Sequence, residues 1–131
     1  MMARANSSLS NPRVALVVSG DSELRKICKD SALGAGFSVE CVDKGVAALN
    51  MARKLLPEVI LLDVELRDVN GFELVTWLGA DAKLRHVPVI AFSTFASDIR
   101  DLRNETGRGK VTLLSKPFQS KDLDKLVRKM I

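Results

Sequence analysis

Asp63, Ser93 and Lys116 have side-chain types and positions that suit phosphoryl-transfer chemistry. Each stands at or just after the end of an apolar segment, in the stretches VILLD, VPVIAFS and VTLLSK. The carboxylate can attack phosphorus, the ammonium can neutralise charge on the phosphoryl oxygens, and the hydroxyl can donate a hydrogen bond to them. We therefore predict a phosphoryl-accepting site with Asp63 as the acceptor, provided that the fold brings the three side chains together.

Five apolar segments have the patterns of strands in a parallel sheet. Val14–Val18 and Val59–Asp63 are apolar without alternation, which is typical of strands covered on both faces. Residues 37–42 alternate apolar and polar side chains, as expected for a half-exposed strand at a sheet edge. Residues 87–92 and 111–115 complete the set of predicted strands.

Apolar residues at helical spacing separate and follow these strands, with the weakest helical pattern at residues 98–105. Alternating strands and helices predict an α/β fold, a doubly wound parallel sheet with helices on both faces. Such a sheet gathers the carboxyl ends of its strands at one edge, where ligands bind. The residues predicted at this edge are Ser19, Gly20, Asp21, Asp63, Ser93, Thr94 and Lys116.

The composition indicates one domain that needs no disulfide or structural metal. With 131 residues, of which 47% are hydrophobic, the chain can bury a sufficient core. We expect a flexible leader over residues 1–12 and one domain over residues 13–131. Cys28 lies in a helical pattern and Cys41 in a strand pattern, so both are predicted to be buried and unbonded, in a reducing cytoplasm.

The sequence gives little support for binding to nucleic acids, membranes or nucleotides. The net charge of +4 comes from scattered lysines and arginines, so a nucleic acid is not an expected partner. No apolar run is long enough to span a membrane, and a cytoplasmic protein without membrane contact is expected. His86, the only histidine, is predicted to lie on the surface. The phosphate-binding patterns GxGxxG and GxxxxGK are absent, which leaves a small nucleotide-binding or enzymatic domain as a weaker alternative.

Three stretches together, LLDVELRDVNGFEL, VPVIAFST and LLSKPF, resemble the signatures of response-regulator receiver domains of two-component signalling. The resemblance covers residues 13–131 and implies a flavodoxin-like (βα)5 fold with strand order 2-1-3-4-5. It implies that Asp63 accepts a phosphoryl group from a histidine kinase or phosphotransfer protein, while Ser93 and Lys116 contact that group. It also implies a cis peptide bond between Lys116 and Pro117.

The family normally has two acidic residues after the first strand, where this chain has Ser19 and Gly20. The resemblance then assures only Asp63 and the backbone carbonyl of Glu65 as ligands for Mg²⁺, so we expect a weak or absent Mg²⁺ site. Asp21 and the Glu65 carboxylate are possible substitutes. A helix cap at Asp21 and a solvated loop acid at Glu65 are the simpler interpretations.

These features predict an atypical receiver that works as a signalling module and binds partner proteins, rather than an enzyme. Asp63 is its potential phosphoacceptor. The main alternative is a conventional Mg²⁺-dependent receiver that uses Asp21 and Glu65 in place of the missing acids. We expect a downstream protein to bind the face formed by the helix at 98–105, the strand at 111–115 and the closing helix.

Overall fold

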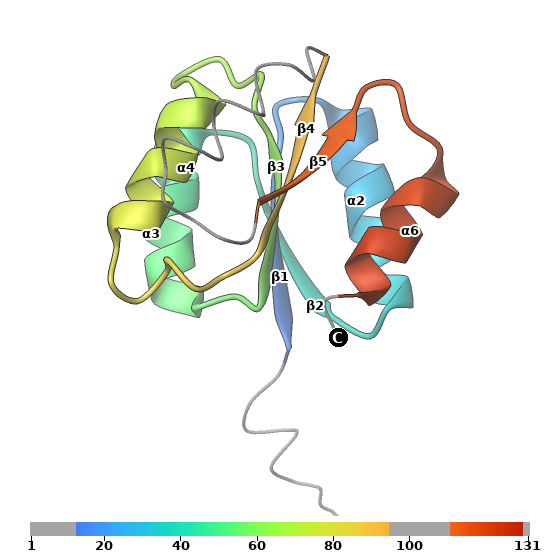
Figure 1. Cartoon of the computed structure of the whole chain (residues 1–131), viewed down its shortest axis with the longest axis horizontal. Coiled ribbons are helices and arrows are strands. Elements are labelled where there is room, and N and C mark those ends of the chain that lie inside the picture. Colours follow the sequence, from blue (N-terminus) through green and yellow to red (C-terminus); the bar gives the residue numbers. More distant parts are fainter. Residues whose placement is uncertain (1–12, 95–110, 130–131) are drawn as a thin grey trace, which may run out of the picture.

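The computed structural model describes residues 13–94 and 111–129. In these ranges the chain forms a five-stranded parallel sheet of order β2-β1-β3-β4-β5 (Figure 1), which confirms the predicted α/β fold. The strands are β1 (Val14–Val18), β2 (Ser38–Val42), β3 (Val59–Asp63), β4 (Val89–Ser93) and β5 (Val111–Ser115). The leader predicted at residues 1–12 and the helix predicted at residues 98–105 lie outside the described residues.

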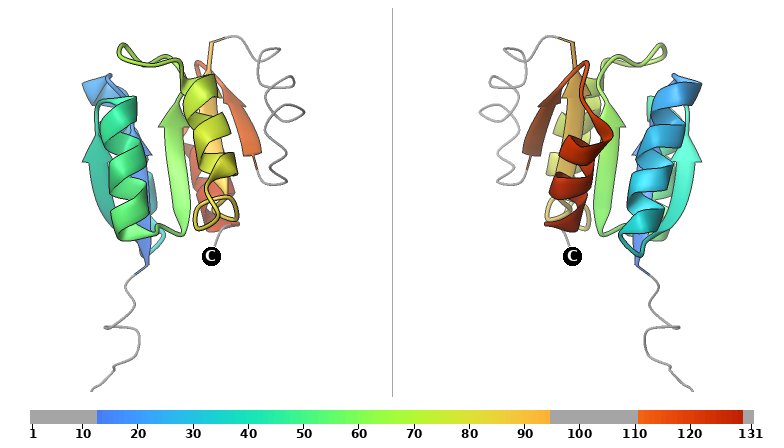
Figure 2. Two further views of the ribbon diagram at one scale, coloured as in Figure 1. Left: turned by 90° about the vertical axis from the view of Figure 1, so that its left-hand side faces the viewer. Right: turned by 90° about the vertical axis from the view of Figure 1, so that its right-hand side faces the viewer.

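The helices described in these ranges cover both faces of the sheet. Helices α2 (Ser22–Gly34) and α6 (Ser120–Arg128) lie on one face, and α3 (Gly45–Leu55) and α4 (Gly71–Ala80) lie on the other (Figure 2). Ser31 Oγ donates a hydrogen bond of 2.6 Å to Asp124 Oδ1 and joins α2 to α6.

Alternate residues of the central strands fill two hydrophobic cores. Leu16, Ile60 and Leu62 belong to the core that includes the apolar residues of α3 and α4. Val17 and Leu61 belong to the core that includes those of α2 and α6. Because successive side chains of a strand point to opposite faces, a strand covered on both sides must be apolar throughout.

Two strands begin later than the sequence pattern predicts. Strand β4 begins at Val89 rather than at residue 87, because the Val87 N–H donates to the Leu84 carbonyl in a turn and Pro88 has no N–H. Strand β2 begins at Ser38, since the N–H of Phe37 donates to the carbonyl of Ala32 in α2.

The prediction of two buried thiols is half right. Cys28 is buried in α2, but Cys41 is exposed, and neither forms a disulfide. Cys41 lies on β2, which is the edge strand that the alternating pattern predicts.

His86 is exposed as expected. Among the described helices, none combines the length and the apolar character needed to cross a bilayer.

Candidate functional site

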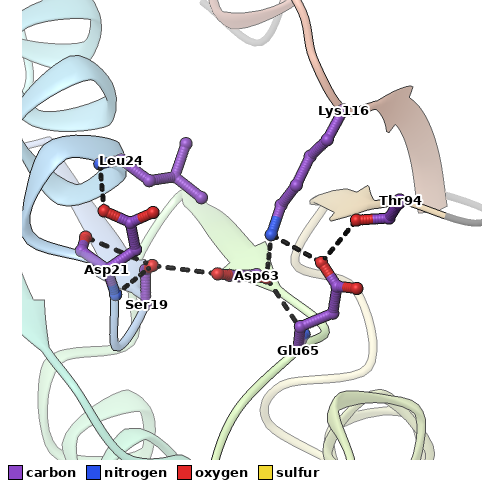
Figure 3. Close-up of polar contacts among 7 residues, drawn as sticks. All are labelled: Ser19, Asp21, Leu24, Asp63, Glu65, Thr94 and Lys116. Carbon is purple, nitrogen blue, oxygen red and sulfur yellow. Dashed lines mark hydrogen bonds and ion pairs between the residues drawn. The ribbon is translucent and has the colours of Figure 1, made fainter.

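The carboxyl edge of the sheet brings together residues that are far apart in the sequence. Asp63 is the last residue of β3, Ser19 follows β1, and Lys116 follows β5 (Figure 3). Asp63 is only 2% exposed. Its burial in a parallel sheet means that its charge must be matched by neighbouring groups rather than by water.

Lys116 provides the positive charge that compensates the buried Asp63 carboxylate. Its Nζ lies 2.8 Å from Asp63 Oδ1, and the Lys116 side chain is 23% exposed. Burial alone would lower the pKa of Lys116, but hydrogen bonds to Asp63 and Glu65 outweigh it and raise the pKa above its ordinary value. The ammonium therefore keeps its charge at neutral pH. The peptide bond between Lys116 and Pro117 is cis, as expected.

Ser19 contacts the other oxygen of the same carboxylate. Its Oγ donates a hydrogen bond of 3.0 Å to Asp63 Oδ2, while Oδ1 accepts from both Lys116 Nζ and the backbone N–H of Glu65. The sequence analysis placed Ser19 at this edge of the sheet, in the position of a missing acid, but did not predict its hydrogen bond to Asp63. A carboxylate oxygen has two lone pairs, so Oδ2, with one donor in the described structure, is the oxygen with spare accepting capacity.

Glu65 takes part in an ion pair that the sequence did not predict. Its Oε1 lies 2.8 Å from Lys116 Nζ and accepts a hydrogen bond of 3.0 Å from Thr94 Oγ1. The hydrogen bond from Lys116, joined by that from Thr94, lowers the pKa of Glu65. Lys116 thus bridges two carboxylates, Asp63 at its buried end and Glu65 near the surface.

Asp21 faces the first helix rather than Asp63. Its Oδ1 accepts hydrogen bonds from the backbone N–H groups of Glu23 at 2.9 Å and Leu24 at 3.3 Å, so it caps the N-terminus of α2. Its substitution for a missing metal ligand stays a prediction, and in this arrangement the carboxylate is already engaged.

Ser93 is the last residue of β4 and is 1% exposed. Its backbone carbonyl accepts from the N–H of Lys116 at 2.9 Å, which aligns the ends of β4 and β5. Ser93 also lines a pocket of about 440 Å³ formed mostly by the loop after β3, including Glu65 and Arg67. The open space at the site is therefore on the side of Ser93 and Glu65.

In this arrangement the carboxylates of Asp63, Glu65 and Asp21 already have other partners and offer few oxygens to Mg²⁺. Mg²⁺ takes near-octahedral oxygen ligands, usually one or two carboxylates with several waters. Here the Lys116 ammonium contacts Asp63, Glu65 is paired with the same ammonium, and Asp21 caps a helix. Within residues 13–94 and 111–129, no three histidine, cysteine, aspartate or glutamate side chains gather as a metal-binding group.

Comparison with solved structures places the fold. The chemotaxis response regulator CheY4 of Vibrio cholerae superposes with a TM-score of 0.79 at 25% identity, covering 92% of this chain and 99% of CheY4. The receiver domain of the sensor histidine kinase PA1611 of Pseudomonas aeruginosa, solved with magnesium in its active-site cleft, has a TM-score of 0.74 at 22% identity. It covers 91% of this chain and 97% of that domain, and its similarity concerns the fold alone.

Sequence comparison gives the family. The polar-differentiation response regulator DivK of Brucella anthropi is 34% identical over 107 residues, which cover 82% of this chain and 86% of DivK. DivK of Brucella ovis is 37% identical over 99 residues, which cover 75% of this chain and 80% of DivK. The family model for the response regulator receiver domain matches residues 15–128. The chain therefore belongs to the family of response regulator receiver domains.

Proposed function

We propose that this chain is an atypical receiver module of a phosphorelay, in which Asp63 accepts a phosphoryl group and Mg²⁺ binds weakly. The observation that carries this proposal is the contact of 2.8 Å between Lys116 Nζ and Asp63 Oδ1, at the edge of a parallel sheet. A buried carboxylate held by one lysine and one hydroxyl has the parts that phosphoryl acceptance needs.

The proposed reaction is a transfer from a phosphohistidine of a histidine kinase or phosphotransfer protein. An Asp63 oxygen forms a bond to phosphorus while the bond between phosphorus and the donor's imidazole nitrogen breaks, and that nitrogen keeps the electron pair. Oδ2 is the oxygen better placed to attack, because it accepts only the hydrogen bond from Ser19 in the described structure. Lys116 then neutralises charge on the phosphoryl oxygens, and Ser93 is the proposed hydroxyl donor to them.

Weak Mg²⁺ binding is proposed from the donor set. Ser19 brings a neutral hydroxyl to Asp63 where the family has acids, so Lys116 alone balances the carboxylate. With one ammonium already paired to both Asp63 and Glu65, the site attracts a divalent cation less strongly than a cluster with two further carboxylates does. We therefore expect phosphorylation to be slow and to depend little on Mg²⁺.

The conventional alternative requires Asp21 and Glu65 to leave their present partners and to bind Mg²⁺ with Asp63. It differs from the proposal in its response to metal. If it holds, phosphorylation rises steeply with Mg²⁺ and falls in an Asp21→Asn variant. In the proposed receiver, the same variant keeps its phosphorylation rate, and it also keeps the cap of α2 because the asparagine amide oxygen can accept the hydrogen bonds from Glu23 and Leu24.

Partner binding is the proposed output of the module. The proposed face includes β5, an edge strand of the sheet, together with α6. Edge strands present unpaired backbone groups, which is one reason why they serve as interaction sites.

The test is intact-mass spectrometry after incubation with a small acyl-phosphate donor, with and without millimolar Mg²⁺. We expect one phosphoryl adduct that forms slowly in both conditions and is absent from Asp63→Asn. Absence of an adduct with this donor, and with a panel of phosphohistidine donors, would contradict the proposal.

A further inference from the structure

We propose that Glu65 competes with the phosphoryl group for Lys116 and Thr94. In the unphosphorylated protein its carboxylate binds both side chains, and a phosphoryl group on Asp63 displaces it. This inference rests on the proposed function of Asp63. In this role Glu65 slows phosphorylation of Asp63, whereas a Glu65 carboxylate that bound Mg²⁺ would speed it.

Glu65 binds Lys116 and Thr94 through one carboxylate oxygen. One carboxylate oxygen, Oε1, lies 2.8 Å from Lys116 Nζ and 3.0 Å from Thr94 Oγ1 (Figure 3). The same Nζ lies 2.8 Å from Asp63 Oδ1. A phosphoryl group attached to Asp63 also needs an anionic oxygen beside Lys116, so Glu65 and the phosphoryl group require the same cation.

The burial of Asp63 limits how a phosphoryl donor can reach its carboxylate. Asp63 is 2% exposed, so a donor reaches its carboxylate only if neighbouring side chains move. The open pocket beside the site is lined by Glu65 and Ser93, so a donor that enters through it comes close to the Glu65 carboxylate. Two anions at one ammonium repel each other, and Glu65, the more exposed of the two acids, is the one that can turn out to solvent.

The ion pair between Glu65 and Lys116 is partly exposed to solvent. The Glu65 side chain is 41% exposed, in contrast to 3% for Asp63. An exposed ion pair is weak, so the contact between Glu65 and Lys116 opens easily and slows phosphorylation without preventing it. Its opening releases Thr94 at the same moment, because both donors bind the same oxygen.

The first test compares the rate of adduct formation in the wild type, Glu65→Gln and Glu65→Ala, measured by intact mass with an acyl-phosphate donor. We expect both variants to react faster, by roughly two- to fivefold, which corresponds to the strength of an exposed ion pair. Glu40→Gln is the matched control, because Glu40 is an exposed acid on β2 whose loss changes net charge equally. Its rate should equal that of the wild type.

The sign of the effect separates two roles of Glu65. If Glu65 binds Mg²⁺, Glu65→Gln reacts more slowly than the wild type when Mg²⁺ is present, and the competitor role is overturned. Equal rates for the wild type and both variants also overturn it.

A second measurement does not require phosphorylation. Inorganic phosphate is titrated into the wild type and Glu65→Ala while the backbone amide resonances of Thr94 and Lys116 are followed. We expect half-saturation in Glu65→Ala at roughly two- to fivefold lower phosphate, because the Glu65 carboxylate no longer competes with phosphate for Lys116. Equal half-saturation overturns the inference. Failure to form an adduct in every variant, with tighter phosphate binding in Glu65→Ala, overturns the proposed function alone.

Discussion

Asp68 Oδ1 accepts a hydrogen bond of 2.9 Å from the backbone N–H of Gly45, so the loop after β3 caps helix α3, which begins 23 residues earlier in the chain. The second oxygen, Oδ2, accepts from the N–H of Val46 at 3.2 Å. Lys44, the residue at the N-cap of α3, provides no side-chain hydrogen bond of its own. The loop that carries Glu65 is thus anchored to α3 through Asp68.

Replacing Asp68 should loosen this anchor. We expect the urea midpoint of unfolding to fall in the order wild type, Asp68→Asn, Asp68→Ala, because asparagine keeps one accepting oxygen and alanine keeps none. Circular dichroism during urea titration measures the order. Equal midpoints for the wild type and Asp68→Ala would show that the cap contributes nothing to stability.

The same contact predicts a pH dependence. Hydrogen bonds from the backbone, foremost that of Gly45, lower the pKa of Asp68. A carboxyl whose pKa is lower in the folded state stabilises the fold above its unfolded pKa, and this contribution is lost as pH falls through the folded value. The stability difference between the wild type and Asp68→Ala should therefore be constant near neutral pH and shrink below about pH 4. A difference that grows in acid would contradict the assignment.

Gly71 allows the other end of the loop to close. A Cβ at this position would lie 2.3 Å from Val64 Cα, and the Gly71 N–H donates to the Val64 carbonyl at 3.0 Å. We expect Gly71→Ala to reduce the free energy of unfolding by roughly 1–3 kcal/mol, because backbone atoms must shift. Gly34→Ala is the control, since a Cβ there meets nothing within 4 Å, and it should be neutral or stabilising by about 0.5–1 kcal/mol. Equal effects of the two substitutions would rule out the steric explanation.

The sequence could predict the pairing of Asp63 with Lys116 because both stand at strand ends. Parallel strands bring their carboxyl ends to one edge, so the topology alone places these residues near each other. The partner of Glu65 could not be predicted in this way. The direction of its side chain depends on how the loop leaves β3, and that path is set by the long-range contact of Asp68 with Gly45 and by the closure of the loop between Gly71 and Val64.

Two further features show the same limit. The pattern at residues 37–42 predicted an edge strand correctly, but it did not predict that Cys41 would be exposed. Burial at an edge depends on how far the covering helices reach, which hydrophobic periodicity does not encode. The hydrogen bond from Ser19 to Asp63 was missed because a hydroxyl after a strand is common, and only the geometry shows its target.

The ion pair between Asp63 and Lys116 should show a measurable coupling. In a double-mutant cycle with Asp63→Asn and Lys116→Met, we expect a coupling free energy of about 1–2 kcal/mol from chemical denaturation. Breaking a fully buried pair costs about 3–5 kcal/mol, but Lys116 is 23% exposed and water reduces the effect. Additive effects of the two substitutions would show that the contact does not stabilise the fold.

The two cysteines should differ in reactivity. Burial raises the pKa of the Cys28 thiol to about 12, and Cys28 is 1% exposed. Burial also raises the pKa of Cys41, but this side chain is open to solvent. A maleimide at neutral pH should modify Cys41 first, and Cys41→Ser should react only as fast as the fold opens. Rapid modification of folded Cys41→Ser would contradict the burial of Cys28.

Restoring acids after β1 should create an Mg²⁺ site. In the double variant Ser19→Asp, Gly20→Asp, a carboxylate takes the place of the Ser19 hydroxyl that contacts Asp63. The space at Gly20 accepts a second acidic side chain, because a Cβ there meets only Asp43 O at 3.8 Å. Repulsion among the carboxylates should lower the thermal midpoint without metal. Mg²⁺ should restore it, since a ligand at 100 times its Kd stabilises the folded state by about 2.7 kcal/mol.

The matched control is Ser19→Asn, Gly20→Asn, which adds similar volume without charge. Its midpoint should not respond to millimolar Mg²⁺, and neither should that of the wild type, because Lys116 already balances Asp63. The measurement is the thermal midpoint by differential scanning calorimetry across an Mg²⁺ titration. If the wild type is stabilised by Mg²⁺ as strongly as the double aspartate variant, then one carboxylate with waters suffices. In that case Mg²⁺ would bind through Oδ2, the Asp63 oxygen with spare accepting capacity, while Lys116 keeps Oδ1, because the ammonium and the divalent cation repel each other strongly on one oxygen.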